Sequence, residues 1–129
     1  NNVVSESKTV LIKNHSFSGK DQRGGSQIIR WNDYYLSITH EVDLFKTYLG
    51  QKDAIYRHRI LVFDVEFNYV GATDAFSFLD FPIEFCVGAT FLDKDLLISF
   101  AVADNAAFIL RVPVSTVNDI LYPIISRKD

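Results

Sequence analysis

Two segments of the chain hold the side chains best suited to chemistry. His40 and Glu41 end one predicted strand, and Tyr56, Arg57 and Arg59 lie within another. An imidazole at a strand end can donate to a phosphate, act as a base or bind a ligand. Two guanidiniums two residues apart form a fork that suits a phosphate or a carboxylate. The structural alternatives are a rim histidine bonded to a neighbour, which the residues alone favour, and arginines paired with nearby acids. Those acids are Asp43, Asp53 and Asp64.

Three other features could contribute to a site. Arg23 precedes the pair Gly24-Gly25, whose backbone N–H groups could approach an anion, although a plain turn is the simpler explanation. Glu84 stands before an apolar run, and Asp104 ends a predicted strand in phase with apolar residues. A carboxylate in such a position is paired with another group of the protein, is bound to a ligand such as a sugar hydroxyl, or lies past the end of the sheet. For Asp104 the alternative is an Asp-Asn turn.

Composition narrows the classes of function. The 129 residues carry a net charge of −3, so we expect no nucleic-acid partner. The chain has a single cysteine, Cys86, which excludes a disulfide framework. Cys86 is predicted to be an inert thiol in the core. His15 is not spaced from other ligand-type residues as metal ligands are. We therefore expect no metal site. A nucleophile elbow and paired carboxylates at recognisable spacing are both missing, so the sequence assigns no catalytic residue.

The chain shows no targeting segment. No apolar run approaches the roughly 20 residues that span a bilayer. Residues 1–8 form a polar tail without the basic and apolar regions of a signal peptide. These features favour a cytoplasmic location without a membrane span. The chain starts with Asn1 and contains no methionine, so we expect it to be trimmed or excerpted from a longer product.

Most of the chain has the pattern of β-strands. Alternation predicts strands over 9–13, 27–31, 34–42, 56–64, 67–72, 83–92, 96–103 and 106–112. His40 shares a strand face with Leu36 and Ile38. Residues 43–55 are predicted to be a long hairpin loop and 73–82 an irregular segment. One helix is predicted over 114–121, stopped by Pro123.

Short connections indicate antiparallel pairing, and segments 26–71 and 83–112 each predict a sheet of three or four strands. The fold class is therefore all-β, with one short C-terminal helix. A sandwich, a barrel or propeller blades would fit this spacing. Long heptads and βαβ alternation are missing, which disfavours a coiled coil and a doubly wound fold.

The order of four motifs adds a resemblance. They are RGGSQIIRW, YYLSITHEV, YRHRILVFD and IEFCVGATFLDKDLLISFAVADNAAFILRVPVSTVNDIL. This series resembles the C-terminal half of a five-bladed β-propeller family of carbohydrate-active proteins, over roughly residues 23–121. The family includes mannoside phosphorylases and propeller domains attached to bacterial glycosyltransferases. The resemblance implies a partial propeller over 1–129, with two to three blades at about 9–71 and 83–112, and a missing N-terminal half as partner.

The resemblance also implies roles for residues. His40 matches the family histidine beside the phosphate or sugar pocket, and Asp104 matches the aspartate that binds sugar hydroxyls. Glu84 and Gly88 match the start of the strand that lines the central cavity. The phosphorylases follow their histidine with glycine, whereas Glu41 stands here, as in the glycosyltransferase-linked branch. The expected substrate contacts are thus His40, Glu41, Tyr56, Arg57, Glu84 and Asp104, and the expected anion contacts are Arg23 and Arg59.

The implied function is phosphorolysis of, or glycosyl transfer to, a mannoside-like glycan. No cofactor is expected, and inorganic phosphate would be the co-substrate of phosphorolysis. His40 and the arginine pair would stabilise an anion while Glu84 and Asp104 hold hydroxyls. The phosphorylase catalytic aspartate belongs to the family's N-terminal half, which no segment here matches. The alternatives are a non-catalytic glycan-binding module attached to a glycosyltransferase and a purely structural propeller segment.

Overall fold

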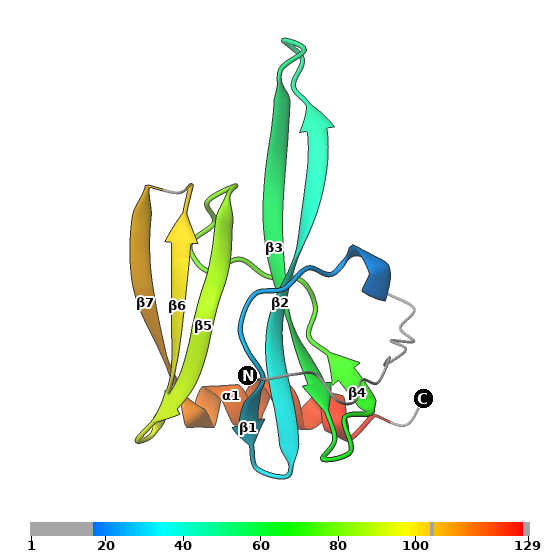
Figure 1. Ribbon diagram of the computed structural model, residues 1–129, viewed down its shortest axis with the longest axis vertical. Coiled ribbons are helices and arrows are strands. Elements are labelled where there is room, and N and C mark those ends of the chain that lie inside the picture. Colours follow the sequence, from blue (N-terminus) through cyan, green and yellow to red (C-terminus); the bar gives the residue numbers. More distant parts are fainter. Residues whose placement is uncertain (1–16, 104, 128–129) are drawn as a thin grey trace, which may run out of the picture.

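The computed structural model describes residues 17–103 and 105–127. Within that part of the chain, seven strands form two antiparallel sheets and are followed by one α-helix (Figure 1). The first sheet has the order β1 (Ile29–Trp31), β2 (Tyr34–Lys46), β3 (Lys52–Phe63) and β4 (Tyr69–Ala72). The second has the order β5 (Glu84–Leu92), β6 (Asp95–Val102) and β7 (Ala106–Pro113). A 3-10 helix, η1 (Gly19–Asp21), precedes β1, and α1 (Val114–Ile125) ends the fold.

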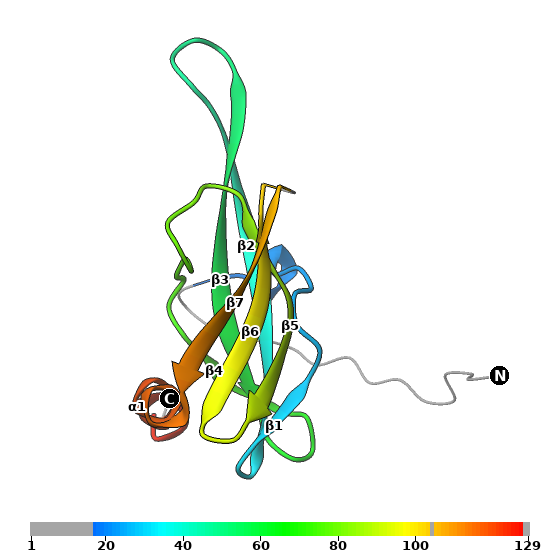
Figure 2. The same ribbon diagram turned by 90° about the vertical axis from the view of Figure 1, so that its left-hand side faces the viewer.

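The core lies between the two sheets and is closed by α1, which crosses their lower ends in Figure 1. Leu36 and Val62 of the first sheet, Leu96 and Ile98 of the second and Leu121 of α1 are all buried in it. Burial of each such side chain contributes about 1.5–3 kcal/mol before entropic costs. Figure 2 shows the second sheet in front of the first, with α1 seen nearly end-on below them. The predicted division into two antiparallel sheets with a C-terminal helix is confirmed.

The prediction of a long loop over residues 43–55 is wrong. β2 and β3 stay paired through Asp43–Ile55 to Lys46–Lys52, so only residues 47–51 turn, with Gly50 at a φ of +79°. This end of the hairpin projects beyond the other strands (Figure 1), and Leu44 is 78% exposed. No core faces the projecting strands, so they need no alternation of apolar and polar residues, and the pattern signal is lost there.

The predicted end of the helix is also wrong, since α1 includes Pro123 and continues to Ile125. A proline in the last turn loses one backbone hydrogen bond. Burial of Ile124 favours continuing the helix. Gly71 of β4 makes room for that side chain, because a Cβ at Gly71 would lie 2.5 Å from Ile124 Cγ2. No helix among the described residues is long and apolar enough to cross a membrane.

Two strands are shorter than predicted. Gln27 leaves the strand pattern to bond the backbone of Ala89 in β5, with its Nε2 2.6 Å from the Ala89 carbonyl. β4 begins at Tyr69 because Asp64 organises a wider turn, in which one carboxylate oxygen accepts from the N–H groups of Glu66 and Asn68. The strand predicted over 9–13 lies outside the described residues.

Candidate functional site

Two histidines lie side by side in the middle of the long hairpin. His40 of β2 and His58 of β3 are direct partners in the register. The backbone of His40 bonds instead to Arg23, and that of His58 to Phe76. The two residues therefore form a non-hydrogen-bonded pair, the kind in which opposite side chains approach most closely. His40 lies on the strand face of Leu36 and Ile38, as predicted, and this face packs on the second sheet.

His58 contacts Glu84, the first residue of β5. Its Nε2 lies 3.3 Å from Glu84 Oε1, and both side chains are fully buried. The carboxylate also accepts hydrogen bonds from the backbone N–H groups of Phe78 and Leu79. A buried carboxylate needs such partners to offset its lost hydration. Glu84 thus holds the segment before β5 in place, with the Phe78 ring stacked on His58 at 4.2 Å between centroids.

His40 stacks on Tyr56 of β3, with ring centroids 5.5 Å apart and planes 10° from parallel. This is a diagonal cross-strand contact. Burial lowers the pKa of His40, and the positive charge of Arg23 lowers it further. The imidazole is therefore neutral at pH 7, with one donor and one acceptor nitrogen. Its Nδ1 is buried and has no hydrogen-bond partner within the described part of the chain.

A cavity of about 340 Å³ adjoins Tyr56 at the edge of β3. It lies between Tyr56 and Arg57 on the strand and residues 75–82, which follow β4. Because Tyr56 both lines this cavity and stacks on His40, the cavity and His40 belong to one region of the molecule. The expectation that Tyr56 and His40 act together is therefore compatible with their placement.

Glu41 and Arg59 lie on the opposite face of the first sheet. Arg59 Nη2 is 3.3 Å from Glu41 Oε1, and Nη1 donates to the Thr73 carbonyl at 3.1 Å. Gln22 donates to the other carboxylate oxygen of Glu41, and the Phe17 ring covers the guanidinium at 4.3 Å. Arg59 is also buried. Its guanidinium is bonded within the protein and is not available to an outside anion. Arg59 is therefore a paired arginine, which was the structural alternative.

The predicted residues thus separate into two groups. Arg23, His40, Tyr56 and Glu84 are brought together, whereas Glu41 and Arg59 form a largely buried network on the opposite face of the sheet. Arg57 is exposed, belongs to neither group, and lines the cavity beside Tyr56. Asp104 lies outside the described residues. The sequence analysis did not predict His58 as a site residue, because its partner, Glu84, lies on a strand of the other sheet. The signal that could have indicated it is that His58 shares a strand face with Tyr56.

One glycine of the pair, Gly25, is required by packing. A Cβ on Gly25 would overlap the carbonyl oxygen of Ile38 in β2, whereas a Cβ on Gly24 would meet open space. Ser26 N–H donates to that same carbonyl at 2.8 Å. Gly25 therefore allows residues 23–26 to lie close along β2, which places Arg23 beside His40. This close approach explains Gly25 without any anion, whereas no contact among the described residues requires a glycine at position 24.

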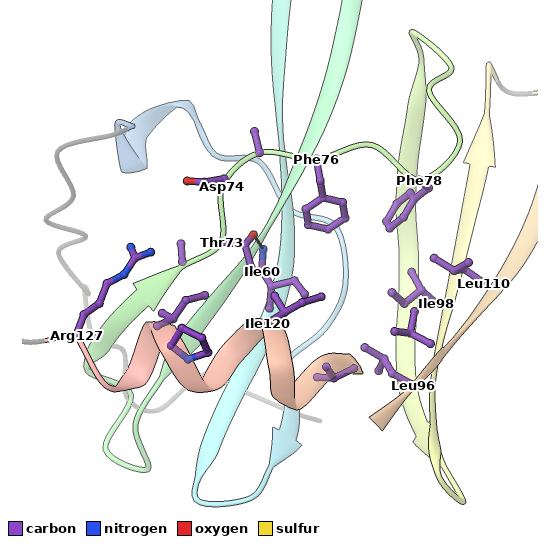
Figure 3. A pocket seen from close by; sticks show the side chains of 16 residues that line it. Ile60, Thr73, Asp74, Phe76, Phe78, Leu96, Ile98, Leu110, Ile120 and Arg127 are labelled. Atoms are coloured by element: carbon purple, nitrogen blue, oxygen red, sulfur yellow. Dashed lines mark hydrogen bonds between the residues drawn. The ribbon is translucent and has the colours of Figure 1, made fainter. Parts of the chain in front are cut away.

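A larger cavity, of about 400 Å³, lies between the sheets above α1 (Figure 3). Its walls are largely apolar, and Asp74 and Arg127 lie on the same side of it in Figure 3. Such a lining offers few polar groups that could orient a sugar. The apolar side chains labelled there are Ile60, Phe76, Phe78, Leu96, Ile98, Leu110 and Ile120.

Thiol and metal chemistry find no support in the described residues. Cys86 is buried in β5, and burial raises its pKa to about 11, which makes the thiol unreactive near neutral pH. No group of three or more His, Cys, Asp or Glu side chains in the described ranges could hold a metal ion.

Comparison with protein-family models, with curated proteins and with solved structures gave no match to this chain. No family is therefore assigned to it. The firmest functional feature is the convergence of Arg23, His40 and Tyr56 on one region, with the buried His58–Glu84 contact behind them.

Proposed function

We propose that this chain is part of a carbohydrate-active β-propeller that acts on or binds a mannoside-like glycan. One observation carries the proposal. Three segments whose motifs resemble the carbohydrate-active family place Arg23 and Tyr56 beside His40, and the fourth supplies Glu84, which contacts the neighbouring His58. Packing of the core alone does not require a part-exposed histidine stacked on a part-exposed tyrosine beside an exposed arginine.

The side chains of this region suit a sugar that carries an anionic group or that is bound next to an anion. A neutral His40 can donate to one hydroxyl or accept from another. Arg23 and Arg57 are exposed, so their guanidiniums can reach a phosphate, which phosphorolysis would need as co-substrate. Arg59 no longer belongs to this set because Glu41 neutralises it. The arginine fork therefore reduces to Arg57.

A second candidate is a glycan-binding module without catalysis, attached to a glycosyltransferase. The burial of Glu84 favours it. This carboxylate is fully buried and accepts two backbone N–H groups, so it stabilises the protein instead of facing a substrate. Together with the resemblance to a C-terminal half, this supports the proposal that any catalytic carboxylate belongs to the N-terminal half of the propeller.

The propeller arrangement is also a proposal. Two successive antiparallel sheets of four and three strands have the form of consecutive blades. β7 is an edge strand with exposed apolar side chains, including Phe108 at 41% and Ile109 at 74% exposure. Exposed apolar edge strands are normally covered or blunted. We propose that the N-terminal half of the propeller covers this edge.

The proposal is tested by screening the protein against neutral mannosides and other oligosaccharides, with and without inorganic phosphate. We expect retention of a mannoside and weaker retention by His40→Ala and Asp104→Ala. Release of a sugar phosphate only when phosphate is added would identify phosphorolysis. Binding without turnover would identify the glycan-binding alternative. If no glycan is retained and neither substitution changes anything, the segment is structural and the proposal fails.

A further inference from the structure

We propose that the cavity at the edge of β3 is the seat of a single neutral sugar ring, bound by Asp80 and Phe81 opposite Tyr56 and Arg57. This inference rests on the proposed function and deepens it, because it adds to the site a loop that no motif marked. The cavity of about 340 Å³ is at the small end of the range for ligand sites, which fits one ring better than a long chain.

The loop over the cavity is fastened to β3 at two points. His58 and Phe76 exchange both backbone hydrogen bonds, and Tyr56 N–H donates to the Pro82 carbonyl at 2.7 Å. Between these points the chain leaves the strand, which opens the cavity. Glu84 adds a third anchor by accepting from the N–H groups of Phe78 and Leu79. A fully buried carboxylate therefore holds an otherwise irregular loop in one conformation.

The anchored loop presents side chains that a folded core does not need. Phe81 is 48% exposed and Leu79 45% exposed. Asp80 has a φ of +61°, a left-handed conformation that is unfavourable for residues other than glycine, asparagine and aspartate. Asp80 is an aspartate and can adopt this conformation, and the three anchors hold the loop that contains it. The result is a fixed loop with an exposed aromatic ring and carboxylate.

The lining matches the chemistry of a pyranose. Tyr56 and Phe81 supply aromatic walls for the apolar C–H face of the ring. Asp80, Ser77 and Arg57 supply acceptors and donors for its hydroxyls. One Asp80 oxygen accepts from the Ser77 hydroxyl at 2.6 Å, and a carboxylate keeps further acceptor positions. The opposite charges of Asp80 and Arg57 favour a neutral ligand over a phosphorylated one.

The test is a titration of the protein with methyl α-mannoside and other neutral methyl hexosides, followed by ligand-observed NMR and calorimetry. Asp80→Asn retains a residue type that tolerates the left-handed conformation but removes the charge. Phe81→Ala removes the aromatic wall, and Phe81→Tyr should restore it. Leu79→Ala is the matched control, because Leu79 is equally exposed in the same loop but does not line the cavity. Melting temperatures confirm that each variant folds.

We expect Asp80→Asn and Phe81→Ala to weaken binding at least about tenfold, with Phe81→Tyr and Leu79→Ala close to the wild type. If the wild type binds and His40→Ala weakens binding while the Asp80 and Phe81 variants do not, the sugar sits elsewhere and this inference alone fails. If the folded wild type binds none of these hexosides, both this inference and binding of a mannoside fail together.

Discussion

His58 Nε2 lies 3.3 Å from Glu84 Oε1 in a fully buried contact that connects the two sheets. β3 carries the histidine and β5 carries the carboxylate. The same carboxylate accepts from two N–H groups of the loop over the β3 cavity. One residue therefore couples the packing of the sheets to the shape of the candidate sugar site.

Glu84→Gln should destabilise the protein strongly although it preserves side-chain volume. The amide keeps only one acceptor oxygen, so an NH2 group faces a backbone N–H or His58 in a site closed to water. We expect the free energy of unfolding to fall by about 2–4 kcal/mol in urea denaturation. Asp43→Asn, which removes an exposed charge from the hairpin, is the control and should change it by less than about 0.5 kcal/mol. A small effect for Glu84→Gln would show that the carboxylate is not needed for packing.

Stability should decrease as the pH falls below neutral. Burial lowers the pKa of His58 below its ordinary value of 6.5, and the Glu84 carboxylate opposes this only in part. The unfolded chain therefore binds more protons than the folded one as the pH drops through 6.5. Urea unfolding between about pH 7.5 and 5.5 should show this loss, and His58→Phe should reduce the slope by up to about 1.4 kcal/mol per pH unit. An unchanged slope in His58→Phe would contradict a neutral buried His58.

The two adjacent glycines should differ sharply in their tolerance of a methyl group. Gly25→Ala forces a Cβ against the Ile38 carbonyl oxygen and should lower the free energy of unfolding by about 1–3 kcal/mol. Gly24→Ala meets open space and should change it by less than about 1 kcal/mol. Chemical denaturation of both variants measures the difference. Equal effects would mean that residues 23–26 do not lie against β2 as described.

Sequence patterns predicted much of this fold because most strands have one face on a core. β6 is the clearest case, with Leu96, Ile98, Phe100 and Val102 all buried and their neighbours less so. The projecting part of the β2–β3 hairpin has no core to face and was therefore missed. The predicted helix end before Pro123 was wrong, because the burial of Ile124 outweighs the low helix propensity of proline.

The candidate site was predictable only one strand at a time. Alternation placed His40 on the face shared with Leu36 and Ile38, as observed. The pairing of Arg59 with Glu41 was not predicted, because it is a diagonal contact between β2 and β3, in which Glu41 lies opposite Arg57. The partners expected for the arginines, Asp43, Asp53 and Asp64, are near them in the sequence. The contact of His58 with Glu84 joins different sheets, which no local pattern encodes. The left-handed Asp80 likewise lies in a loop that is anchored to the distant strand β3 by backbone bonds of His58 and Tyr56.

The propeller proposal makes a prediction about the exposed edge. Ile109 is 74% exposed on β7, so Ile109→Lys in this chain alone should change the free energy of unfolding by less than about 0.5 kcal/mol. In a longer protein that contains a matching N-terminal half, the same lysine would be buried against it and should cost at least about 2 kcal/mol. Thermal or urea unfolding of both forms provides the comparison. An equally small effect in both would argue that nothing covers this edge.

The most direct test of the central claim is a map of backbone and histidine NMR signals during titration with methyl α-mannoside. The account predicts that the largest shifts fall on Arg23, His40 and Tyr56 and on the loop that carries Asp80 and Phe81. Signals of residues around the apolar cavity above α1, such as Leu110 and Ile120, should stay in place. The absence of any shift at saturating sugar, or shifts confined to that apolar cavity, would contradict the claim that this face of the hairpin binds a glycan.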